Sequence, residues 1–192
     1  MNYNFKTTND SIINDLEKLK STCDYISENS KAEYIKSMPP TQNVIPKQYI
    51  YTKEAGEQVK NLVHETKQAI KEKIKKMYNV VAGDITKAPT QEALNVVEAL
   101  KMRNTISAEE MELYMDKYSD NYQIYGVLKD IAKSKNVIVR TSEHPQMVIA
   151  DNLKNFEKNI EWHLSVNNAV NGRIDNVMIC AFEQELNNIV PE

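Results

Sequence analysis

The three histidines, the two cysteines and the scattered serines are the residues best suited to acid–base, metal or nucleophilic chemistry. His64, His144 and His163 lie far apart, and no pair has the spacing that places two zinc ligands on one helical face. Cys23 and Cys180 lack a CxxC or paired Cys/His spacing. No nucleophile comes with an identifiable base, and the glycines form no phosphate-binding loop. The sequence therefore predicts no catalytic residue, no metal ligand and no cofactor-binding residue.

Three carboxylates lie close together at Glu109, Glu110 and Glu112. Ser107 and Glu110 have the spacing of a capping box, and a helix dipole favours acidic residues in a first turn. These local roles account for the cluster without paired acids for glycoside hydrolysis. A small enzyme whose groups converge only in the folded chain stays as one alternative function.

Tyrosine and methionine recur at helical spacing in the segment 107–135, which we expect to fold as two helices joined by a short turn. These side chains are the candidate interface: Met111, Tyr114, Met115, Tyr118, Tyr122 and Tyr125. Both residue types are enriched at the centres of protein interfaces, so the stripe predicts a partner surface. The alternative interpretation is the wall of a hydrophobic core, with the tyrosine hydroxyls reaching the surface.

Two features allow a nucleic-acid-binding regulator as another alternative. The segment 107–135 has the outline of a helix-turn-helix, and the lysine-rich stretch 67–76 offers a basic patch at Lys67, Lys71 and Lys75. However, 107–135 carries more acidic than basic residues, and a DNA-reading unit should neutralise several phosphates. The net charge of −3 also provides no field that would recruit nucleic acid. We therefore do not expect nucleic acid as the partner.

Periodic apolar residues predict most of the chain to be helical, over 10–36, 52–78, 90–102, 107–118, 121–135 and 145–190. The last region is expected to form one very long helix, or two long helices broken near Gly172. Asn29 and Ser30 are expected to interrupt the first helix, and residues 1–9 are expected to form a loose arm. A capping side chain, Thr52 or Thr90, precedes the second and third helices.

The segments between these helices have different compositions. Three prolines exclude helix from residues 37–52 and predict an extended strap there. A connector is expected over 79–87, with a turn at Gly83 and Asp84. The β-branched run Val137–Val139 allows one very small β-sheet with the end of the strap or with the connector.

The helical stripes also predict which side chains are buried. We expect both Cys23 and Cys180 to be buried free thiols, and His163 to be a hydrogen-bonded core residue. His64 is expected to be exposed. The inward face of the C-terminal region includes Phe156, Ile160, Val177, Ala181, Phe182 and Leu186.

The sequence thus predicts a mainly α protein: an elongated bundle of about six helices with an extended proline-containing strap. We expect a single helical domain over 1–192, in which 88–136 forms a compact three-helix subdomain. The favoured function is non-catalytic, namely protein–protein interaction or assembly, with a protein partner or with itself as a homo-oligomer.

Composition and hydropathy bear on the source and the location. Only three of the 24 basic residues are arginines, a bias typical of AT-rich genomes, so a phage-encoded structural or accessory protein is one version of the favoured function. Residues 1–10 lack the apolar segment of a signal peptide, and no apolar run has the length of a membrane span. We therefore expect no membrane partner and a cytoplasmic location, or a place in the virion if the protein is phage-encoded.

Overall fold

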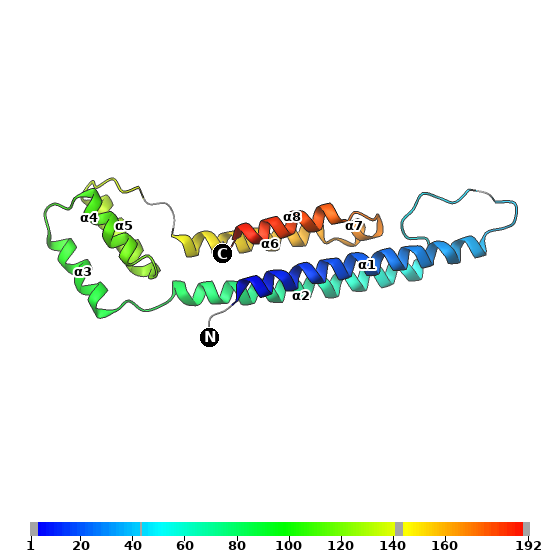
Figure 1. Ribbon diagram of the computed structural model, residues 1–192, viewed down its shortest axis with the longest axis horizontal. Coiled ribbons are helices and arrows are strands. Elements are labelled where there is room, and N and C mark those ends of the chain that lie inside the picture. The colour runs from blue at the N-terminus through cyan, green and yellow to red at the C-terminus, as the bar shows by residue number, and fades with distance from the viewer. Residues whose placement is uncertain (1–3, 43, 141–143, 190–192) are drawn as a thin grey trace. The chain divides into compact units, whose positions relative to one another are not determined.

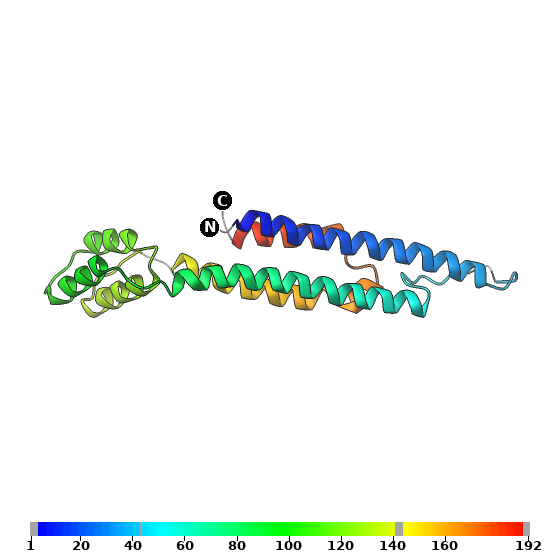
Figure 2. The ribbon, with the colours of Figure 1, turned by 90° about the horizontal axis from the view of Figure 1, so that it is seen from below.

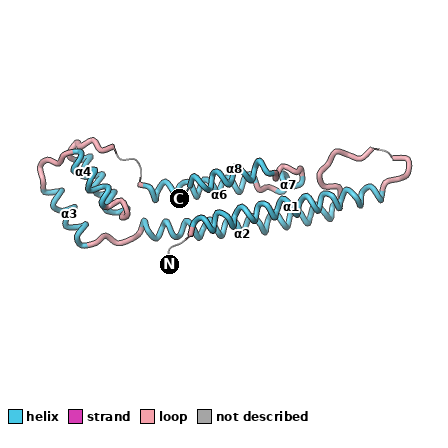
Figure 3. Tube along the Cα trace, in the orientation of Figure 1, coloured by secondary structure: helices cyan, strands magenta, loops and turns pink. Residues whose placement is uncertain are grey.

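The computed structural model describes residues 4–42, 44–140 and 144–189, and helices make up 76% of the chain. The prediction of a mainly α fold is confirmed. Within these ranges the chain forms eight helices rather than about six. The described residues contain no strand, so the small sheet expected at Val137–Val139 does not form (Figure 3).

Contacts group the chain into two compact units. Unit 1 contains residues 1–77 and 153–192, and unit 2 contains residues 78–152. The sequence favoured one helical domain with a compact three-helix subdomain, and the segment proposed for that subdomain, 88–136, lies inside unit 2.

Unit 1 is built on four long helices, two of which, α2 and α6, continue into unit 2. They are α1 (Phe5–Ser37), α2 (Lys53–Ile85), α6 (Pro145–His163) and α8 (Asn176–Ile189). Figures 1 and 2 show α1 beside α2 and α8, and α6 beside the same two helices, so the four form a bundle. The predicted core residues Phe156, Ile160, Phe182 and Leu186 are confirmed, because each is at most 3% exposed.

Both N-terminal helices are longer than expected. α1 begins at Phe5 because the Asn4 side chain accepts a hydrogen bond from the Thr7 backbone N–H at 3.0 Å, so residues 5–9 of the expected loose arm are helical. Residues 1–3 of that expected arm lie outside the described residues. Ser30 does not interrupt α1, since its hydroxyl donates to the Ser27 carbonyl within the helix. α2 continues past Tyr78 to Ile85, which removes most of the expected connector.

The strap between α1 and α2 is held along α1 by its last residues. The Tyr49 hydroxyl donates to the Asp24 carboxylate, and the Ser27 hydroxyl donates to the Tyr49 carbonyl. Further on, the Tyr51 backbone N–H donates to the Ser30 hydroxyl at 3.3 Å. α2 then begins with Thr52 as its cap, since Thr52 Oγ1 accepts from the Ala55 N–H at 3.2 Å.

The C-terminal region is interrupted twice rather than once. α6 ends at His163, and Ser165 caps the short helix α7 (Val166–Val170). Gly172 then turns the chain with a φ of +67°, a conformation that glycine adopts without steric cost. The interruption near Gly172 is therefore confirmed, and the one at Leu164–Ser165 is an addition.

Unit 2 packs three helices around a hydrophobic centre: α3 (Gln91–Met102), α4 (Ala108–Lys117) and α5 (Tyr122–Ser134). Thr90, Ser107 and Asn121 cap these helices, and the sequence predicted the first two of these caps. Asn136 ends the hairpin with a φ of +56°. Val137 and Val139 pack against the three helices while Ile138 points outward, so the β-branched run covers a core instead of joining a sheet.

Candidate functional site

The best candidate for a functional surface is a groove of about 620 Å³ in unit 1, formed by the end of α6, by α7 and by α8. We call it the Trp162 groove and define it by Trp162, His163, Arg173, Val177, Met178 and Glu185. Trp162 is 79% exposed and Val177 is 77% exposed, although both are large apolar side chains. Neither was predicted, since sequence periodicity placed Val177 on the inward face.

Packing beneath the groove explains why these two side chains point outward. The Phe182 ring lies between α6 and α8, with its centroid 5.7 Å from that of Phe156 in an edge-to-face arrangement. Phe182 thereby occupies the inward position, so Val177 and Ala181 lie on the solvent side of α8. His163 is exposed, so the prediction of a core histidine is wrong. Its ring centroid lies 5.9 Å from that of Phe182.

Hydrogen bonds fix the polar edge of the groove. The Asn159 side chain donates to Glu185 Oε1 at 2.8 Å and thus ties α6 to α8. Asp175 Oδ1 accepts from the Met178 backbone N–H at 2.9 Å and caps α8. Asn168 donates from its side chain to the His163 carbonyl at 2.9 Å. These contacts hold the two helix ends and α7 in place around the exposed indole.

Arg173 differs from the other polar residues of this edge, whose side chains form hydrogen bonds. Its backbone N–H donates to the Asn168 carbonyl at 2.8 Å, which fixes the position of the residue. Its guanidinium is exposed and has no hydrogen bond or ion pair with any side chain in the described ranges. The groove therefore combines an exposed apolar floor with one unpaired cation.

The tyrosine and methionine stripe in unit 2 is mostly core, and the predicted interface is corrected accordingly. Met111 and Met115 are 0% exposed, and Tyr118 and Tyr125 are each 7% exposed. Only Tyr114 and Tyr122 are partly accessible. The physical reason is that α4 and α5 face each other through this stripe, so its helical spacing serves the packing of the unit.

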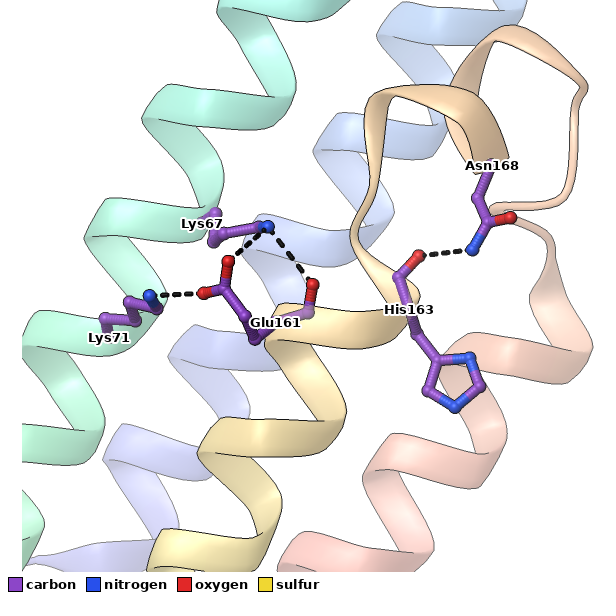
Figure 4. Close-up of polar contacts among 5 residues, drawn as sticks. All are labelled: Lys67, Lys71, Glu161, His163 and Asn168. Carbon is purple, nitrogen blue, oxygen red and sulfur yellow. Dashed lines mark hydrogen bonds and ion pairs between the residues drawn. The ribbon is translucent and has the colours of Figure 1, made fainter.

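The predicted basic patch is largely neutralised by its neighbour helix. Lys67 Nζ lies 3.1 Å from Glu161 Oε1 and 3.2 Å from the Glu161 carbonyl, and Lys71 pairs with the other oxygen of the same carboxylate. Figure 4 shows Glu161 between the two lysines, while the His163 imidazole points away from them. Hydrogen bonds from Lys71 and Lys67 lower the pKa of Glu161, and Lys75 alone stays exposed.

A smaller cavity of about 240 Å³ in unit 2 contains a buried histidine that the sequence placed in a loop. His144 is 4% exposed, and its ring meets Tyr122 and Tyr125 edge to face, with centroids 5.3 and 4.9 Å away. His144 Nδ1 accepts from the Gln146 N–H at 3.3 Å, while Nε2 is buried without a hydrogen-bond partner among the described residues. Burial lowers the pKa of His144, and the nearby Ser119 carbonyl offsets part of this shift.

The cysteines differ from each other. Cys23 is buried, as predicted, and burial followed by the charge of Asp24 raises the pKa of its thiol to about 11. Cys180 is exposed, so the prediction for it is wrong. It lies one residue after the buried Ile179, on the outer side of α8. No three His, Cys, Asp or Glu side chains come together as metal ligands in the part of the chain that the structure describes.

Comparison with known proteins adds no assignment. No protein-family model, curated protein or solved structure matches this chain. Among the described helices, none is both long enough and apolar enough to cross a membrane.

Proposed function

We propose that this protein is a non-catalytic interaction or assembly component that binds a protein partner in the Trp162 groove. The observation that carries the proposal is the exposure of Trp162 beside Val177 on a concave surface. A tryptophan buries about 150–250 Å² in a contact, which corresponds to roughly 4–6 kcal/mol before the costs of association. Tryptophan is also among the residues that most often dominate the energy of protein interfaces.

The surroundings of the indole support the same proposal. Productive interfaces place an apolar anchor at the centre and satisfied polar groups around it. Here Asn159 with Glu185 and Asn168 with the His163 carbonyl form such pairs at the edge. The polar edge is therefore already arranged for a partner that covers the centre.

The basic residues of the predicted patch give weaker support for nucleic-acid binding than the groove gives for protein binding. Lys67 and Lys71 share Glu161, and an incoming phosphate would have to displace that carboxylate. We therefore propose a protein as the partner, either a different protein or a second copy of this chain. The proposal keeps a cytoplasmic location, or the virion if the protein is phage-encoded.

The test compares Trp162→Ala with Tyr25→Ala, which removes another exposed aromatic side chain of unit 1, 65% exposed on α1. Each variant and the wild type would be used to capture partners from a lysate of the source cells, and sedimentation would measure self-association. We expect Trp162→Ala to lose the captured partner or the self-association, while Tyr25→Ala keeps it. Equal capture and equal sedimentation of all three proteins would remove the proposal.

A further inference from the structure

The polar groups of the Trp162 groove differ in whether they already have hydrogen-bond partners. Glu185 accepts from Asn159, and Asp175 accepts from the Met178 N–H. The Asn168 side chain donates to a carbonyl. The Arg173 guanidinium, in contrast, has no partner among the described residues. Arg173 is thus the charged side chain of the groove that has no hydrogen bond among the described residues, whereas Glu185 and Asp175 each have one.

This difference limits what can cover the groove. A charged or polar group that is removed from water without a partner opposes binding, whereas a group that is already hydrogen-bonded opposes it less. A guanidinium presents a planar fork of N–H donors that matches a carboxylate in a bidentate pair. An occupant that covers Arg173 should therefore bring a carboxylate.

The carboxylates of the groove do not cancel this preference. Asp175 caps the N-terminus of α8, where the helix dipole favours a negative charge. Glu185 lies on α8, ten residues after the capping Asp175, which corresponds to roughly 15 Å along the helix axis. That separation exceeds the screening length at physiological salt of about 8 Å. Arg173 therefore lies two residues before the capping Asp175, at the start of α8, whereas Glu185 lies roughly 15 Å further along that helix.

We propose that the Trp162 groove binds a protein segment that places an apolar side chain over Trp162 and Val177 and a carboxylate at Arg173. This inference rests on the proposed function and specifies the chemistry of the partner. An amphipathic helix with glutamates beside its leucine stripe has these features, because leucines at helical spacing fill a groove between helices. The carboxylate then pairs with a guanidinium that has no hydrogen-bond partner among the described residues.

Trp162 is the only tryptophan of the chain, so its fluorescence reports directly on the groove. The probes are two synthetic helical peptides with the same leucine stripe, one flanked by glutamates and the other by lysines, both without tryptophan. Titration at low salt should show a change in Trp162 emission, with the glutamate peptide binding about tenfold or more tightly than the lysine peptide. Arg173→Gln should abolish most of this preference.

Arg140→Gln is the matched control, because Arg140 is an exposed arginine of unit 2 and the substitution changes the net charge equally. It should leave the preference intact. Equal binding of the two peptides, or tighter binding of the lysine peptide, would overturn the inference while leaving groove docking in place. A lack of response to both peptides would also overturn it, and the capture experiment with Trp162→Ala would then decide the proposed function separately.

Discussion

The ring of Tyr49 lies directly over Gly172. A Cβ atom at position 172 would lie 2.9 Å from Tyr49 Cδ2 and 3.1 Å from Cε2, closer than side chains normally approach. Tyr49 belongs to the strap between α1 and α2, and Gly172 belongs to the turn between α7 and α8 (Figure 1). The Tyr49 hydroxyl also donates to Asp24 of α1. One tyrosine thus joins the strap, α1 and the turn that precedes the groove-forming helix α8.

Gly172→Ala should therefore lower the free energy of unfolding by about 1–3 kcal/mol, because it adds the Tyr49 clash to an unfavourable left-handed backbone. Chemical denaturation followed by circular dichroism measures this change. Gly56→Ala is the control, since nothing lies within 4 Å of its Cβ position in α2, and it should be neutral or stabilise by up to about 1 kcal/mol. Equal midpoints for both variants would show that Tyr49 does not cover Gly172.

The sequence predicted those parts of the fold that depend on local interactions. Thr52, Thr90 and Ser107 were each identified as helix caps, because a cap needs only its own side chain and the next three residues. The end of α2 was misplaced because its last turns depend on tertiary packing. Val81 is 4% exposed, and that burial outweighs the turn tendency of Gly83.

The candidate site was harder to predict than the fold. The stripe that contains Met111 and Met115 has the same spacing whether it faces a partner or its own core, and only the position of α5 shows that it is core. Trp162 precedes His163 by one residue and therefore lies outside the apolar stripe of α6. Its position on the helix thus indicated that the indole would be exposed. Val177 carried no such signal, because its exposure depends on Phe182 filling the space between α6 and α8.

The two cysteines should react at very different rates. Cys180 is exposed and should be labelled quickly by a thiol reagent in native buffer. Cys23 is buried, and its thiol pKa of about 11 leaves only about a thousandth of it as thiolate at mildly alkaline pH. Mass spectrometry of peptides after a short labelling pulse would separate the two sites. Rapid labelling at Cys23 in the native state would contradict the packing of α1 against the bundle.

Acidification should destabilise unit 2 through His144. Burial holds the pKa of His144 in the folded protein below its unfolded value of about 6.5, so the unfolded state binds more protons at mildly acidic pH. The free energy of unfolding that the buried neutral His144 contributes is fully present above the pKa of the unfolded state, and it is lost as the pH falls below that pKa. The free energy of unfolding should therefore fall between about pH 7.5 and pH 5, and His144→Gln should flatten that part of the profile.

His163→Gln is the matched control for this measurement. His163 is exposed and belongs to unit 1, so its substitution removes a histidine without changing the cavity around His144 in unit 2. The groups near His144 must be considered with it, namely Lys129, Asp151, Tyr122 and Tyr125 around the cavity. Parallel profiles for the wild type and for His144→Gln would show that these groups, rather than the histidine, set the acid sensitivity.

Glu161→Gln should make the protein a better binder of polyanions. The substitution removes the carboxylate that Lys67 and Lys71 share, and both ammonium groups then become available beside the exposed Lys75. Two additional cations should steepen the dependence of log affinity for single-stranded DNA on log salt by about 1.4. Heparin chromatography and titration with single-stranded DNA at several salt concentrations would measure this change.

Glu157→Gln is the matched control, because it removes one negative charge from an exposed position of the same helix and should alter the slope little. An equal gain for both variants would mean that net charge alone is responsible, and tight binding by the wild type would favour the nucleic-acid alternative over a protein partner.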